Sequence, residues 1–209
     1  MFRAARLAAA LTVIVTLVTP ALAAEEIGAV TRVQKAAWAL STGANRNLEV
    51  GAPIFAGDVL STGSEARLEV AFADGTLLTL GQNAVIEIDD YVYDPDSEEG
   101  SGVWQVISGA FLMVTGEIAK TSPEFFSVRT PVAHVGIRGT QFWGGLIDDG
   151  YGVLVLEGAI TVTTPAGTVV LDAVGEGTMV AEAGAAPSDP IIWGDAKRVR
   201  ALETVTFAE

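Results

Sequence analysis

The fold of this chain is predicted best from one stretch, Val128-Arg129-Thr130-Pro131-Val132-Ala133-His134-Val135-Gly136-Ile137-Arg138-Gly139-Thr140-Gln141-Phe142. β-branched residues up to Thr130 indicate an extended strand. Pro131 fixes its own φ angle and disfavours a helical conformation at Thr130. Gly136 and Gly139 allow a positive φ or a close backbone approach on either side of Arg138. The stretch therefore predicts strand, turn and strand, with Arg138 held by a tightly folded backbone.

Two interpretations of Arg138 follow from this setting. In the first, its five N–H donors satisfy carbonyl groups at a strand bend; in the second, it contacts a ligand or partner. The structural interpretation is preferred, because buried polar groups usually bond to the backbone. His134 is the only histidine in the chain, and without a second histidine or a cysteine it does not indicate a metal site.

The same stretch resembles the signature of the FecR domain family, named after the iron-dicitrate regulator. Three further segments match that family in order, namely Ala56-Gly57-Asp58-Val59-Leu60-Ser61-Thr62-Gly63, Phe72-Ala73-Asp74-Gly75-Thr76-Leu77-Leu78-Thr79-Leu80 and Val155-Leu156-Glu157-Gly158-Ala159-Ile160-Thr161-Val162. Each segment alone is weak, but four in register are specific. The motif positions, which serve either the fold or a partner contact, are Gly57, Asp58, Asp74, Gly75, Thr130, Pro131, Gly136, Arg138, Gly139 and Thr140.

Turn signals recur about every 8–12 residues between Ile27 and Glu182, with no helical period between them. This spacing predicts an all-β fold, and the clearest hairpin turn is Asp74-Gly75. No repeat of fixed length is present, so the spacing by itself leaves a sandwich, barrel or solenoid open. The resemblance to the FecR family implies a β-solenoid-like roll of many short strands. The alternative is a β-sandwich or jelly roll.

Composition excludes several classes of protein. The chain has 209 residues, half of them apolar, and no cysteine, which rules out disulfides and a thiolate metal site. The formal net charge is −14. Such an acidic surface repels nucleic acid and anionic lipid, so we expect no nucleic-acid partner. Partners should be neutral or basic, or bind to a local patch.

The two ends of the chain differ from its middle. Residues 1–23 have the pattern of a signal peptide, with Arg3 and Arg6 before an apolar run and Ala21-Leu22-Ala23 as a cleavage site. Cleavage after Ala23 would leave ten basic and 26 acidic residues in a mature chain that does not span a membrane. We expect an all-β domain at 24–186, then a linker and a short helix at 187–209.

The C-terminal helix is expected to begin near Asp189 and Pro190, which suit a cap and a first helical position. It carries a cluster of positive charge in an acidic protein, formed by Lys197, Arg198 and Arg200. Two interpretations are open: the helix docks on the acidic domain, or it binds a partner.

The resemblance implies a periplasmic or secreted protein of a Gram-negative bacterium, acting as a binding, scaffolding or signal-sensing module for a periplasmic or envelope protein. Regulatory FecR proteins relay the ligand state of an outer-membrane receptor to a cytoplasmic sigma factor. They need a cytoplasmic segment and a membrane span, neither of which is recognised here. We therefore expect the domain, but not the sigma-regulator function, to carry over.

Other functions have weaker support. An extracellular glycan-binding or surface-structural protein is the alternative, with possible stacking on Trp104, Trp143, Tyr91 and Tyr93; these residues are more simply explained as core. The chain shows no nucleophile elbow and no phosphate loop, so we expect neither an enzyme nor a cofactor. Acidic residues 94–99 are interpreted as a solvated loop, since they lack the EF-hand spacing; a weak calcium site is the alternative.

Overall fold

The computed structural model describes residues 25–41 and 43–208. The predicted signal peptide at 1–23 lies outside them. The strands are β1 Glu26–Gln34, β2 Ala37–Ser41, β3 Ala44–Asn47, β4 Pro53–Phe55, β5 Val59–Thr62, β6 Arg67–Phe72, β7 Leu77–Leu80, β8 Val85–Asp94, β9 Glu99–Ser108, β10 Phe111–Val114, β11 Phe126–Arg129, β12 His134–Ile147, β13 Gly150–Thr164, β14 Gly167–Leu171, β15 Glu176–Val180 and β16 Ile191–Ile192. The helices are α1 Ile118–Thr121 and α2 Asp195–Glu203, and a 3-10 turn, η1, spans Pro123–Phe125.

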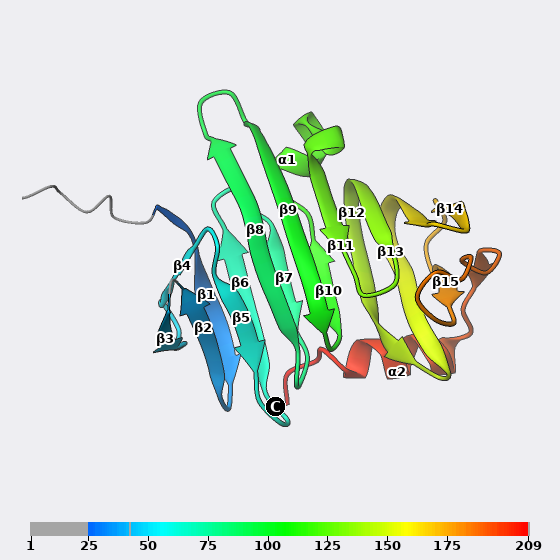
Figure 1. The fold of residues 1–209 in the computed structure, drawn as a ribbon, viewed down its shortest axis with the longest axis horizontal. Coiled ribbons are helices and arrows are strands. Elements are labelled where there is room, and N and C mark those ends of the chain that lie inside the picture. Colours follow the sequence, from blue (N-terminus) through cyan, green and yellow to red (C-terminus); the bar gives the residue numbers. More distant parts are fainter. Residues whose placement is uncertain (1–24, 42, 209) are drawn as a thin grey trace, which may run out of the picture.

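The strands of the described residues form one sheet that curls over itself, so that its two halves lie face to face (Figure 1). One half runs in the order β3, β2, β5, β8, β9 and β11, and the other in the order β4, β1, β6, β7 and β10. The long strands β12 and β13 belong to both halves. The start of β12 pairs with β11, and its middle pairs with β10. All pairs are antiparallel except β9 with β11.

The core fills the space between the two halves. Phe72 on β6 lies 4.5 Å from Trp104 on β9 and 5.6 Å from Tyr91 on β8, measured between ring centroids. Leu68, Val70 and Phe72 are buried, as their alternation in the sequence predicts. Each large apolar side chain buried in this way contributes about 1.5–3 kcal/mol relative to an exposed one.

The prediction of an all-β fold with a short C-terminal helix is confirmed. The predicted start of that helix is wrong. Ile191 and Ile192 after Pro190 form β16 and pair with β15, and α2 begins only at Asp195. The two β-branched isoleucines pair with Glu176 and Gly177 of β15. This strand pairing outweighs the helix-start pattern around Pro190.

Helix α2 docks on the outer side of the sheet. Both Lys197 and Arg200 make ion pairs with Asp148, at 3.0 and 2.5 Å. The Trp143 indole N–H donates a hydrogen bond to the Thr204 hydroxyl at 3.0 Å. A second apolar cluster forms there from Trp143, Ile147, Leu154, Trp193, Ala201 and Val205. Of the two interpretations of the basic helix, the structure shows the docked one.

Among the described helices, none has the length and apolar character needed to cross a bilayer.

Candidate functional site

The motif glycines mark the crease at which β12 and β13 pass from one half of the sheet to the other. The β12–β13 register shifts between Arg138 and Gln141. Gly139 has a φ of +56° and Gly158 a φ of +76°. A Cβ atom on Gly158 would lie 2.1 Å from the Gly139 carbonyl oxygen. Only glycine allows the two strands to approach this closely.

Hydrogen bonds of Thr140 join the crease to Thr115, the residue after β10, and to β13. Its backbone N–H donates to the Thr115 hydroxyl at 2.7 Å, and that hydroxyl donates to the Thr140 carbonyl at 3.0 Å. The Thr140 hydroxyl donates to the Ala159 carbonyl at 3.0 Å. Both threonines are buried. Thr140 therefore satisfies the backbone groups that the bend removes from regular pairing.

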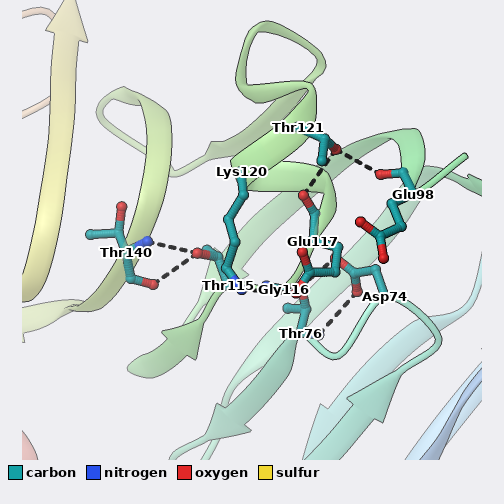
Figure 2. Close-up of polar contacts among 9 residues, drawn as sticks. All are labelled: Asp74, Thr76, Glu98, Thr115, Gly116, Glu117, Lys120, Thr121 and Thr140. Atoms are coloured by element: carbon teal, nitrogen blue, oxygen red, sulfur yellow. Dashed lines mark hydrogen bonds and ion pairs between the residues drawn. The ribbon is translucent and has the colours of Figure 1, made fainter.

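The Asp74-Gly75 turn lies next to the hydrogen-bonded pair Thr115 and Thr140 (Figure 2). The buried Asp74 carboxylate accepts hydrogen bonds from the Thr76 N–H and hydroxyl and from the Tyr91 hydroxyl, at 2.8–3.0 Å. The Thr76 hydroxyl in turn accepts from the Gly116 N–H at 2.9 Å. Gly75 takes a φ of +84°, as this turn requires.

We call Asp74, Thr76, Tyr91, Thr115 and Thr140 the crease cluster. Burial is the main cause that raises the pKa of Tyr91, and the nearby charge of Asp74 adds to it. The phenol therefore stays protonated and can donate to the carboxylate. The sequence pointed to Asp74 and Thr140, but the roles of Tyr91 and Thr115 come from distant strands.

Short helix α1 closes the same end of the molecule (Figure 2). The Thr121 hydroxyl donates to the Glu98 carbonyl at 2.6 Å, and the Lys120 ammonium donates to the Glu117 carboxylate at 2.8 Å. The Glu117 N–H donates to the Asp74 carbonyl at 2.9 Å. These contacts join the acidic loop, α1 and the Asp74 turn.

Asp58 is fully buried on the other half of the sheet. Its carboxylate accepts a bond from Arg46 at 2.5 Å and from the Phe55 N–H at 2.9 Å. Gly57, with a φ of +80°, completes that turn. Both Asp58 and Asp74 thus bind groups of this chain.

Thr130 and Pro131 form the turn between β11 and β12. The Thr130 N–H and hydroxyl both donate to the Ala133 carbonyl, at 2.8 and 2.9 Å. The turn sets where β12 begins and therefore which side chains of His134–Ile147 face outward. His134 and Arg138 are on the exposed side.

Arg138 differs from the other charged motif residues. Its side chain is exposed, and its guanidinium group makes no hydrogen bond or ion pair with any residue that the structure describes. The interpretation of Arg138 as a donor to buried carbonyls does not match this geometry. The bend positions its backbone but leaves the guanidinium group in solvent.

Arg138 borders a shallow groove of about 390 Å³ on the outer side of the sheet. We call it the Arg138 groove; its lining residues are Pro123, Glu124, Gly136, Ile137, Arg138, Ala159, Ile160, Thr161 and Val170. The floor of the groove consists of uncharged residues without long side chains. They are Val170 on β14, its cross-strand partner Thr161 on β13, and Gly136, which pairs with Thr161, on β12. Phe125 follows Glu124 in sequence, is 59% exposed and lines a neighbouring hollow that also contains Glu124. This groove brings two motif residues, Gly136 and Arg138, to one surface.

The aromatic residues considered for glycan stacking are mostly inside the protein. Trp104 and Trp143 are fully buried and Tyr91 is 5% exposed. Tyr93 is half-buried. Stacking on sugars needs an exposed ring face, so the stacking hypothesis is wrong for the two tryptophans and Tyr91.

The acidic loop shows local hydrogen bonding. The Asp96 N–H donates to Asp94 at 2.9 Å, and this bond is the main cause that lowers the pKa of Asp94. Within residues 25–41 and 43–208, no group of three or more acidic, histidine or cysteine side chains is placed to hold a metal ion.

Comparison with known proteins agrees with this architecture. The model of the family described as FecR protein matches residues 58–161. The chain therefore carries a FecR domain and belongs to that family over these residues, which include Asp58, the crease cluster and Arg138. No curated protein matches the chain significantly.

Two solved structures have a similar fold. Both are of a proposed anti-sigma factor from Parabacteroides distasonis, at 1.65 Å and 2.50 Å resolution, with TM-scores of 0.53 and 0.54 and 20% identity. The match covers 69% of this chain, and 64% and 63% of those chains. At this identity the likeness establishes the fold, and the matched part is less than two thirds of each neighbour.

Proposed function

We propose that the protein is a non-enzymatic FecR-domain module of the periplasm or cell envelope that binds a protein partner through the Arg138 groove. A role in signalling is favoured over pure scaffolding, because the chain carries a FecR domain and the structural neighbours are described as an anti-sigma factor. The periplasmic location rests on the signal-peptide pattern at 1–23.

One observation carries the proposal. The motif puts an exposed cation, whose side chain has no partner in the part of the chain that the structure describes, one residue before a buried bend in a protein of net charge −14. The bend fixes the backbone from which the guanidinium group projects, so binding orders the side chain but needs no ordering of the backbone. The small floor residues provide apolar contact area beside it, and the exposed Phe125 lines a neighbouring hollow that shares Glu124 with the groove. Arginine and aromatic residues are the side chains most enriched at binding hot spots.

The test uses the mature chain, residues 24–209, as bait in a cross-linked pull-down from the periplasmic fraction. Arg138→Glu should abolish capture of a stoichiometric envelope protein. Lys35→Glu is the matched control, because Lys35 is an exposed cation outside this groove whose one ion pair, to Glu65, lies on the surface. Both variants should keep the wild-type melting temperature to within a few degrees. Equal capture by wild type and Arg138→Glu would refute the Arg138 groove as the contact surface.

A further inference from the structure

The curled sheet ends in strands that have only one neighbour, and these edges differ in their protection. Natural proteins protect edge strands by charge, by proline or by shortness. Strand β3 carries Arg46 between two asparagines, and β4 has three residues and begins with Pro53. Strand β16 has two residues and follows Pro190. Each of these edges is protected by one of the usual devices.

Strand β14 has none of these devices. Its sequence is Gly-Thr-Val-Val-Leu over Gly167–Leu171, with no charge, no proline and no register shift against β13. It pairs with β13 alone. Among the described residues, no turn or loop forms a backbone hydrogen bond with it. Figure 1 shows β14 at the margin of the sheet.

The backbone of β14 presents free groups at regular intervals. Thr164 and Gly167 flank a two-residue turn, so this pair exchanges hydrogen bonds and the following pairs alternate. The N–H and C=O groups of Thr168 and Val170 then point away from β13. Leu171 is buried while Val170 is 54% exposed, so the strand has one core face and one open face.

The open face of β14 continues into the Arg138 groove, since Val170 lines it. A strand added at this edge would extend the floor that Val170, Thr161 and Gly136 form. Its alternate side chains would lie beside Val170, on the same side as Arg138. The edge supplies main-chain hydrogen bonds, and the groove supplies side-chain contacts, which is the division found in strand addition.

We propose that β14 accepts an extended segment of the partner protein as an additional strand. The segment has β-branched residues at alternate positions and basic residues at its ends. Asp172 directly follows β14 and is exposed, and the whole chain is strongly acidic, so a basic segment is attracted. A second copy of this chain is disfavoured, because two copies of net charge −14 repel each other. The inference rests on the proposed protein-binding function and specifies its docking mode.

The probe is the labelled peptide acetyl-Lys-Val-Thr-Val-Thr-Val-Lys-amide, with a Glu-ended version as the charge control. Binding to the mature chain is followed by fluorescence anisotropy, and hydrogen exchange locates it. The Lys-ended peptide should bind more tightly than the Glu-ended one, and the Thr168 and Val170 amides should become protected. Absence of binding, or binding without protection of β14, would overturn the proposal.

Two variants locate the contact. Val170→Pro removes an outward N–H while leaving the expected bonds to β13, and should weaken the peptide about 10-fold. Val170→Lys should weaken it as well, and it remains informative if the proline variant does not fold. Leu146→Lys is the control, since Leu146 is 74% exposed on β12 and lies outside the groove; it should change affinity less than about 2-fold.

The outcomes separate the two proposals. If Arg138→Glu abolishes partner capture but Val170→Pro leaves capture and peptide affinity unchanged, the binding function stands and strand addition is wrong. If the peptide binds β14 but Arg138→Glu captures as much partner as wild type, the groove proposal fails. The wild-type chain could also sediment as a dimer, and Val170→Pro could abolish that dimer. This result would assign the β14 edge to a second copy of the chain and overturn the choice of a partner segment.

Discussion

The crease cluster and the Arg138 groove each take a residue from the same stretch of β12, and these two residues, Thr140 and Arg138, lie on opposite sides of that strand. Thr140 is buried and its side chain and backbone are bonded on two sides. Arg138, two residues earlier on the same strand, is exposed and has no partner among the described residues. A motif that is continuous in sequence thus divides into a part that holds the fold and a part that faces solvent.

The difference shows how the two kinds of residue respond to change. Residues of the crease cluster satisfy buried backbone groups, so their removal leaves unpaired donors and acceptors in the interior. The Arg138 guanidinium group stays in solvent and bonds to none of the described residues. Its removal should therefore change partner binding but not the free energy of unfolding. Substitutions in the two parts of the motif should therefore differ in their effect on the free energy of unfolding.

Asp74→Ala should cause the largest loss of stability. It leaves the Thr76 N–H, the Thr76 hydroxyl and the Tyr91 hydroxyl without their acceptor. The free energy of unfolding in urea should fall by about 3 kcal/mol. Asp96→Ala, in the exposed loop, should change it by less than about 0.5 kcal/mol. A loss below about 1 kcal/mol for Asp74→Ala would mean that the cluster does not hold the fold.

Gly158→Ala tests the close approach at the crease. The new Cβ would meet the Gly139 carbonyl oxygen, and φ is positive as well. The loss should be about 2–3 kcal/mol. Gly184→Ala is the matched control, because Gly184 has a φ of +87° and no atom near its Cβ position. It should cost about 1 kcal/mol. Equal losses at both sites would exclude a steric role for the crease.

Tyr91→Phe should lower the free energy of unfolding at pH 7 by about 1–2 kcal/mol, since Asp74 loses a hydrogen-bond donor. It should also change the alkaline pH dependence. Burial raises the pKa of Tyr91 above its usual value, so the unfolded chain loses this proton first. Stability conferred by the protonated phenol is therefore present below pH about 10 and is lost as pH rises further. The variant should show a shallower decline above pH 10, and an unchanged slope would argue against the buried phenol.

Arg138→Ala should have the smallest effect on stability, within about 0.5 kcal/mol. Arg46→Ala is the informative comparison, because it leaves the buried Asp58 carboxylate without its cation. That variant should lose about 2 kcal/mol. Thermal and urea unfolding measure both. If Arg138→Ala were as destabilising as Arg46→Ala, Arg138 would belong to the structural part of the motif.

Part of the candidate site was visible in the sequence. The Asp74-Gly75 turn, the glycines at the bend and the motif order all led to the residues that form the crease. Tyr91 was considered only as an aromatic ring, because its bond to Asp74 joins strands 17 residues apart in sequence. Val170 and Pro123 gave no local signal, and Val170 reaches the groove because β14, β13 and β12 pair in a register that aligns Val170, Thr161 and Gly136.

The all-β class, the hairpin turns and the presence of a C-terminal helix follow from the amino-acid sequence alone, because they depend on alternation, on glycine and on local turn chemistry. Long-range strand pairing sets which face of β12 meets the core, and therefore that Thr140 is buried and Arg138 is exposed. A register shift between Arg138 and Gln141 sets that choice. Such a shift depends on pairing with a strand distant in the chain, and a local pattern of residues cannot specify it.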